Sequence, residues 1–267
     1  MPASAVRRLL PLAALAAASA LILSACAGPA ATDGAVETDP NGEVVWAIEG
    51  ANLSAGHMDP QISQLDVSAM VQRQVLDSLV FQEADGSFKP WLAKSWEVSD
   101  DGTTYTFQLR DDVTFHDGEP FNAEAVKANF DRIIDPDTVS AQAASMLGGE
   151  YYAGTEVISE YEVAVSFTQP YAPFLQAAST AQLGFWSPKV LEESGDELKA
   201  GGPDINVGTG PFVLSEYTPD QELVYTRNDD YAWGPHGEKA PGFETLRVEI
   251  LPEASVRTGV VASGEAD

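Results

Sequence analysis

The stretch 95-SWEVSDDGTTYTFQLR-110 predicts a β-hairpin and indicates the kind of fold to which the chain belongs. Two runs of strand-forming residues flank an Asp-Gly pair, which favours a tight turn between antiparallel strands. In the second run Tyr105, Phe107 and Leu109 alternate with polar residues. Because successive side chains of a strand point to opposite faces, this alternation indicates a sheet with one buried face.

A helix is predicted shortly after the hairpin, in 120-PFNAEAVKANFDRII-134. Asn122 is a favourable N-cap residue, and Glu124 lies in the first turn, where a carboxylate complements the helix dipole. The apolar residues that form one stripe along this helix are Ala125, Val126, Phe130 and Ile133. A hairpin next to an amphipathic helix predicts an α+β unit.

Strand and helix patterns also alternate outside this unit. Apolar residues recur at helical spacing from Ser63 to Leu79, which predicts a helix there. Further hairpins are predicted at 155–170 and 210–229, strands at 44–48 and 244–252, and helices at 187–194 and 253–267. The interleaved pattern predicts an α/β chain that carries an α+β subdomain.

The N-terminus has the pattern of an export signal. The run from Leu9 to Leu23 is almost entirely apolar and is short for a membrane span. It ends in Leu-Ser-Ala-Cys, which resembles the lipobox of bacterial lipoproteins, with Cys26 as the only cysteine of the chain. We therefore expect a signal peptide at 1–25, a lipid on Cys26 and a flexible tether at 26–43. The preceding arginine pair fits general secretion and leaves twin-arginine export open.

The charge of the chain excludes some partners. The 267 residues contain 14 Lys and Arg against 41 Asp and Glu, a net charge of −27. Such a surface repels nucleic acids and anionic lipid headgroups, so no nucleic-acid partner is expected. Hydrophobic residues make up 44% of the chain, which is the composition of a folded domain. We interpret the acidity as a solvated surface.

Sequence motifs for catalysis or metal binding are not found. The glycines of 207-VGTGPF-212 open no helix, so they do not form a nucleotide-binding loop. His57, His116 and His236 are far apart and lack the spacing of zinc ligands. No Gly-x-Ser-x-Gly nucleophile elbow is present, and neighbouring carboxylates are common in so acidic a chain. We expect no catalytic residues, no metal site and no cofactor.

Three separated stretches together resemble one protein family. They are residues 79–133, residues 208–234 and the final helix with its Ser-Gly-Glu-Ala-Asp ending, 255–267. In this order they resemble family 5 of the solute-binding proteins, the extracytoplasmic receptors of ABC importers for peptides, nickel and related solutes. The resemblance extends from residue 44 to the end of the chain. It identifies a scaffold, whereas the glycines and aromatic residues of the motifs have ordinary roles in turns and in the core.

The resemblance implies a periplasmic-binding-protein-like lobe of type II with an inserted β-rich α+β subdomain. The first lobe is then discontinuous, formed by 44–76 and 179–267, and the inserted subdomain covers 77–178. The family's second lobe would begin where this sequence stops, at Asp267. The expectation is therefore one incomplete lobe, with the second lobe absent and weak ligand binding by this part alone.

The resemblance also implies where a ligand cleft lies. The chain is expected to cross the inner surface of the lobe just after the Met-Asp-Pro sequence and again at Gly-Phe-Trp-Ser-Pro. The candidate substrate-binding residues are Gln64, Leu65, Asp66, Phe185 and Trp186. Core packing is the alternative role for Trp186, and a first-turn helix carboxylate is the alternative for Asp66.

The predicted function is capture of a ligand, most simply a peptide, and its delivery to ABC permease subunits in the membrane. The protein is expected to be monomeric when complete and to stay outside the membrane on its lipid anchor. Two alternatives are a secreted, lipid-anchored hydrolase and a surface lipoprotein that interacts with another protein. The ligand that copurifies with the protein distinguishes these functions.

Overall fold

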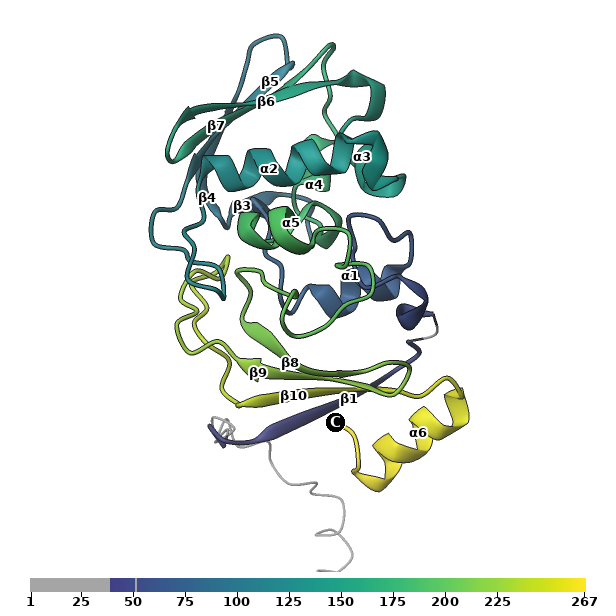
Figure 1. Ribbon diagram of the computed structural model, residues 1–267. Coiled ribbons are helices and arrows are strands. Elements are labelled where there is room, and N and C mark those ends of the chain that lie inside the picture. The colour runs from purple at the N-terminus through teal and green to yellow at the C-terminus, as the bar shows by residue number, and fades with distance from the viewer. Residues whose placement is uncertain (1–38, 51) are drawn as a thin grey trace, which may run out of the picture. The chain divides into compact units, whose positions relative to one another are not determined.

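The structure is a computed structural model that describes residues 39–50 and 52–267 (Figure 1). The predicted signal peptide, Cys26 and most of the predicted tether lie outside the described residues. Two four-stranded sheets, with helices between them, organise the described part (Figure 1).

The first sheet combines a strand from the beginning of the described chain with three strands from its end. Its order is β1 (Glu43–Ile48), β10 (Thr245–Ile250), β9 (Glu222–Arg227) and β8 (Phe212–Thr218). β1 runs parallel to β10, and the other neighbours are antiparallel. Alternate residues of β10 are buried, and Arg247 between them forms ion pairs with Glu43 and Glu222 on the neighbouring strands. The strand predicted at 244–252 is thus confirmed.

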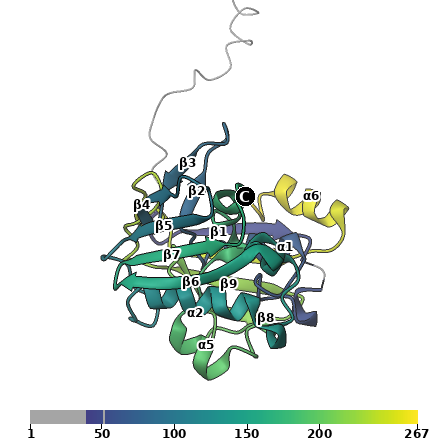
Figure 2. The same ribbon diagram turned by 90° about the horizontal axis from the view of Figure 1, so that it is seen from above.

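The second sheet is antiparallel throughout and contains two of the predicted hairpins. Its order is β4 (Ala93–Val98), β5 (Thr104–Leu109), β7 (Glu162–Phe167) and β6 (Tyr152–Ser159). Helix α2 (Ala123–Ile134) packs against β6 and β7, and the strands run across it in the view from above (Figure 2). The predicted N-cap is confirmed, because Asn122 Oδ1 accepts a hydrogen bond from the Ala125 N–H at 3.0 Å.

Shorter elements complete the described part of the chain. β2 (Val80–Gln82) and β3 (Phe88–Pro90) form a separate two-stranded sheet. The remaining α-helices are α1 (Asp66–Gln72), α3 (Gln142–Met146), α4 (Phe174–Ala177), α5 (Pro188–Ser194) and α6 (Ala254–Ser263). Four 3₁₀ turns are η1 (Leu53–Ala55), η2 (Pro136–Thr138), η3 (Gly149–Tyr151) and η4 (Ala181–Leu183). No helix in residues 39–50 and 52–267 is long and apolar enough to cross a membrane.

Helix α1 is shorter than predicted. The helix expected to continue to Leu79 ends at Gln72. The carbonyl groups of Gln74 and Val75 accept hydrogen bonds from Phe212 and Gly210 at 3.0 and 2.8 Å, and so do not continue a helix. This approach depends on glycine, since a Cβ on Gly208 would lie only 2.1 Å from the Val75 carbonyl oxygen. These contacts with the glycine-rich segment at 208–212 end the helix before the apolar periodicity of the sequence does.

The turn at His116 docks on the same glycine-rich segment. The His116 N–H donates to Gly208 O at 2.9 Å, and the imidazole Nε2 lies 3.0 Å from Gly210 O. Burial lowers the pKa of His116, which favours a neutral ring that donates from Nε2 and accepts the Gly208 N–H at Nδ1. This histidine is a structural clip between distant segments.

The strands of the first sheet all come from residues 43–48 and 212–250, and those of the second from 93–167. Hydrophobic residues from both regions belong to one continuous core cluster. The division into a first lobe at 44–76 and 179–267 and an inserted subdomain at 77–178 stays a prediction.

Candidate ligand-binding site

Three of the five predicted residues lie at the start of α1. The side chains of Gln64 and Asp66 are exposed, and Leu65 is partly buried. Within residues 39–50 and 52–267, neither Gln64 nor Asp66 uses its side chain in a hydrogen bond or an ion pair. The amide of Gln64 and the carboxylate of Asp66 are therefore available to a ligand.

Ser63 fixes the backbone that carries these residues. Its buried hydroxyl accepts a hydrogen bond from the Leu65 N–H at 3.1 Å and is hydrogen-bonded to the Ser68 hydroxyl at 2.7 Å. The single proton of the Ser68 hydroxyl is donated to the carbonyl oxygen of His57. The hydroxyl groups thus connect the first turn of α1 to the loop before it and hold the exposed residues in place.

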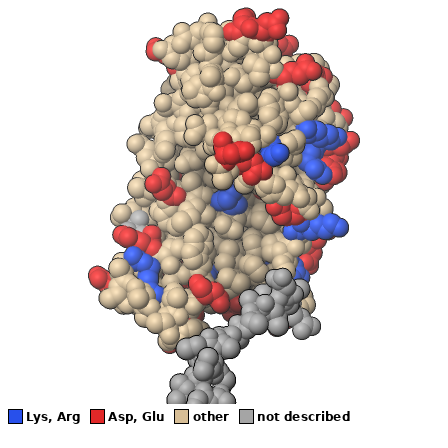
Figure 3. All heavy atoms as spheres, turned by 180° about the vertical axis from the view of Figure 1, so that it is seen from behind, with Lys and Arg blue, Asp and Glu red and all other residues tan. Residues whose placement is uncertain are grey.

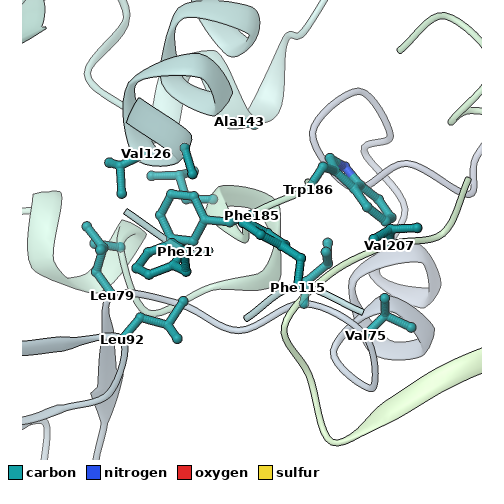
Figure 4. Packing of buried hydrophobic residues seen from close by; sticks show 14 of the residues in the cluster. Val75, Leu79, Leu92, Phe115, Phe121, Val126, Ala143, Phe185, Trp186 and Val207 are labelled. Atoms are coloured by element: carbon teal, nitrogen blue, oxygen red, sulfur yellow. The ribbon is translucent and has the colours of Figure 1, made fainter. Parts of the chain in front are cut away.

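Phe185 and Trp186 lie in the core, where both are fully buried. The ring of Phe185 packs against Phe121 and Phe130, with centroid separations of 5.2 and 5.7 Å. Trp186 lies close to Val207 in the same cluster (Figure 4). In this structure neither side chain presents surface to a ligand.

The two predicted stretches nevertheless meet. Trp186 Nε1 donates a hydrogen bond to Asp59 Oδ1 at 3.1 Å, and Asp59 belongs to the Met-Asp-Pro sequence. The Trp186 N–H donates to Asn129 Oδ1 at 2.9 Å. The structure therefore joins the segments and exposes only the first of them. That all five residues line one concave surface stays a prediction.

A buried polar network supports this meeting point. The Asp59 carboxylate pairs with Arg132 at 2.6 Å, and Arg132 also donates to Gln61 Oε1 at 2.5 Å. Gln61 Nε2 in turn donates to Asn129 Oδ1 at 2.9 Å. The network joins the loop before α1 to α2, and it was not predicted. Asn129, a polar residue that interrupts the apolar stripe of α2, is the feature of the sequence that indicates a buried polar contact there.

An open groove of about 710 Å³ lies between the C-terminal end of α2 and α5. None of the five predicted residues lines it. Its walls carry the carboxylates Asp135, Asp137, Glu192, Glu193, Asp196 and Glu197. Acidic side chains are also scattered over the face of the molecule shown in Figure 3. The carboxylates at this groove therefore do not distinguish it from the rest of this acidic surface.

The structure contains one serine close to a histidine, which bears on the hydrolase alternative. Ser63 Oγ lies 3.3 Å from His57 Nδ1. Ser63 is only 3% exposed, and its hydroxyl already takes part in the two hydrogen bonds that fix α1, one with the Leu65 N–H and one with the Ser68 hydroxyl. These contacts are typical of a structural hydroxyl and not of an accessible nucleophile. Among the described residues no group of three or more His, Cys, Asp or Glu could hold a metal ion.

Comparison with known families identifies the scaffold that carries this site. The sequence model described as bacterial extracellular solute-binding proteins, family 5 middle, matches residues 87–267. The chain belongs to family 5 of the bacterial extracellular solute-binding proteins. The matched region of this family 5 protein includes the second sheet, α2 and the Gly208–Gly210 turn, so the predicted resemblance is confirmed.

Curated relatives of this family 5 protein are binding proteins. It is 32% identical to the nickel-binding periplasmic protein of Escherichia coli (strain K12) over 219 residues, which are 80% of this chain and 39% of the relative. It is 37% identical to the dipeptide-binding protein of the same strain over 197 residues, 66% of this chain and 35% of the relative. The chain thus spans about two fifths or less of each of these two relatives.

A solved relative shows the same fold. The periplasmic binding protein DppA from Helicobacter pylori, in complex with the peptide STSA, has a TM-score of 0.71 and 25% sequence identity, covering 85% of this chain and 46% of that one. The described residues of the family 5 protein correspond to one lobe of a type II periplasmic binding protein. The predicted fold class is therefore confirmed.

Proposed function

We propose that this chain acts in an extracytoplasmic receptor of an ABC importer, which captures peptides in a cleft and delivers them to the membrane permease. The observation that carries the proposal is the 37% identity with a dipeptide-binding protein. The peptide in the complex of the H. pylori relative supports the same ligand class. Binding of this kind is capture without a chemical step, in agreement with relatives that are named for what they bind.

The start of α1 is proposed to contact the ligand directly. The Asp66 carboxylate suits the amino group of a peptide, and the Gln64 amide can bond either a backbone N–H or a carbonyl. Trp186 is proposed to contribute through Asp59, whose loop leads to these residues, and Phe185 through the core beneath Trp186. The 44–76 and 179–267 segments then form the surface on which a hinged partner lobe closes.

Identification of the bound ligand tests the function. The complete protein is purified without denaturation, and the released ligands are analysed by mass spectrometry. Short peptides are the expected result. A nickel chelate would redirect the proposal to another solute, cleaved products would favour the hydrolase, and a stoichiometric protein would favour the interaction role.

Titration of the peptide so identified tests the site. Asp66→Asn is expected to weaken binding about tenfold or more, since a charged hydrogen bond contributes about 1.5–3 kcal/mol. Asp204→Asn, which changes an exposed aspartate elsewhere, is the matched control and should bind as the wild type does. Equal affinity of the wild type and Asp66→Asn would remove Asp66 from the site and leave the ligand class untouched.

The proposed membrane attachment depends on Cys26. Cells grown with a fatty-acid analogue are expected to label the wild-type protein and not Cys26→Ala, because the thiol is the predicted lipid acceptor. Detection of both proteins with an antibody controls for expression. Labelling of Cys26→Ala at the wild-type level would show that the lipobox prediction is wrong.

A further inference from the structure

A polar cluster lies where the chain leaves α1 and enters β2. Arg73 donates from Nη1 to the Leu76 carbonyl and to Ser78 Oγ at 3.2 and 2.8 Å. Its Nη2 donates to the Ser179 carbonyl at 2.9 Å. The guanidinium also lies over the ring of Trp91, 5.0 Å from the centroid. One side chain thus ties residues 76–78 to the distant segment at 179.

Asp77 lies in this cluster and is fully buried. Its Oδ2 accepts hydrogen bonds from Trp233 Nε1 at 2.9 Å and from the Thr209 hydroxyl at 3.1 Å. Its Oδ1 is buried as well and has no hydrogen-bond partner among the described residues. Tyr231 lies beside the carboxyl group. Asp77 therefore connects residues 76–78, the junction between α1 and β2, to the segment between Thr209 and Trp233.

Asp77 has no ion-pair partner. Arg73 is a nearby positive charge and opposes the effect of burial on Asp77, but both of its Nη groups donate to other oxygens, and no Lys, Arg or His in residues 39–50 and 52–267 forms an ion pair with Asp77. Burying an ionised carboxylate without an ion-pair partner costs free energy of folding. A protonated carboxyl group avoids this cost, and its O–H at Oδ1, the oxygen without a partner, can donate a hydrogen bond. The hydroxyl oxygen of Tyr231 is a suitable acceptor.

Electrostatics agree with this geometry. Burial raises the pKa of Asp77 to about 7, against the opposing effects of the Trp233 hydrogen bond, the charge of Arg73 and the Thr209 and Tyr231 hydroxyls. Burial also raises the pKa of the Tyr231 phenol, which stays neutral. The negative charge of Glu238 also raises the pKa of Tyr231.

We propose that Asp77 is a proton-binding site of the folded protein: ionising its buried carboxyl group costs more than the hydrogen bonds from Trp233 and Thr209 return, so loss of the proton destabilises the contact between the 209–233 segment and residues 76–78. The proposal does not depend on the ligand or on the transport function. It makes the stability of the junction sensitive to the pH outside the membrane.

The direction of the pH effect follows from linkage. The folded state binds this proton more tightly than the unfolded state, whose aspartate has the ordinary value of 3.8. The folding equilibrium constant should therefore fall as pH rises, by up to tenfold for each pH unit between about pH 4 and pH 7, and then level off. Asp77→Asn carries a neutral amide in place of the protonated carboxyl and lacks this dependence.

Urea denaturation of the complete protein between pH 4.5 and 8.5 tests the proposal. The ratio of the folding constants of Asp77→Asn and the wild type should rise by up to tenfold per pH unit and reach a plateau above neutrality. Asp100→Asn, in the exposed turn between β4 and β5, is the control and should show no such rise. A constant ratio for Asp77→Asn would overturn the proposal.

A direct measurement covers the case in which Asp77→Asn does not fold. The ¹³C NMR signal of the Asp77 carboxyl group in the wild-type protein is followed over the same pH range. Titration near neutral pH is expected. Titration near pH 4, at the ordinary value for aspartate, would show that the group is ionised in the folded protein and would overturn the proposal.

Discussion

Asp59→Ala is expected to lower the free energy of unfolding by about 3–5 kcal/mol, the typical result of removing one partner of a buried ion pair. Asp59 is fully buried, and Arg132, its partner at 2.6 Å, is only 12% exposed. The substitution leaves the guanidinium charge without its carboxylate and the indole Nε1–H of Trp186 without its acceptor. Chemical denaturation followed by tryptophan fluorescence measures the loss.

The matched control is Asp229→Ala, which also removes a carboxylate from an aspartate–arginine pair at 2.6 Å. Because Asp229 is 77% exposed, its removal should cost less than about 1 kcal/mol. Similar losses for the two variants would mean that the Asp59 pair is hydrated and does not stabilise the meeting of the two segments.

Phe185→Ala is expected to lower the free energy of unfolding by about 3–5 kcal/mol, because it empties a fully buried aromatic site. Phe121, just before the N-cap of α2, and Phe130, within α2, both pack against the ring, so its removal takes away contacts with the start and the middle of this helix. Thermal and chemical unfolding of the purified protein give the loss independently.

Phe185→Leu is the control for this prediction, since leucine keeps most of the apolar volume and should retain most of the stability. The pair of variants also separates packing from ligand contact. If Phe185→Ala kept its stability within about 1 kcal/mol and lost peptide binding, the ring would face the ligand and not the core. The buried position of Phe185 favours the opposite result.

Local signals explain which elements could be predicted from the sequence. Helix α2 has an N-cap at Asn122 and a clear apolar stripe, and its observed start at Ala123 follows from these features. The hairpins of the second sheet combine alternation with turn residues such as Gly102, whose φ of 69° favours glycine. In each case residues close in sequence specify the structure.

Contacts between distant segments explain what was missed. The end of α1 depends on Gly210 and Phe212, which take the carbonyl groups that a longer helix would need. The parallel pairing of β1 with β10 also leaves no mark in the residues near Glu43. Periodicity alone could not reveal either feature, because the partners lie far along the chain.

For the candidate site, the sequence indicated which segments take part but not which side chains are exposed. Resemblance to the family selected two segments, and the hydrogen bond between Asp59 and Trp186 shows that they meet. Whether a particular side chain points outward depends on packing, so Gln64 and Asp66 are exposed whereas Trp186 is buried. The Asp59–Arg132 pair needed the three-dimensional structure, since each residue alone resembles an ordinary surface charge.

The parallel pairing of β1 with β10 also constrains the order of folding. Glu43 pairs with Thr245, so β1 has no neighbour to pair with until the chain has been synthesised as far as β10. The hairpins and α2 between Ala93 and Phe167 have partners close in sequence and can assemble first. During that interval β1 has no β10 to pair with and can bind another strand. We expect a chaperone or a rapidly folding middle segment to protect it during synthesis and export.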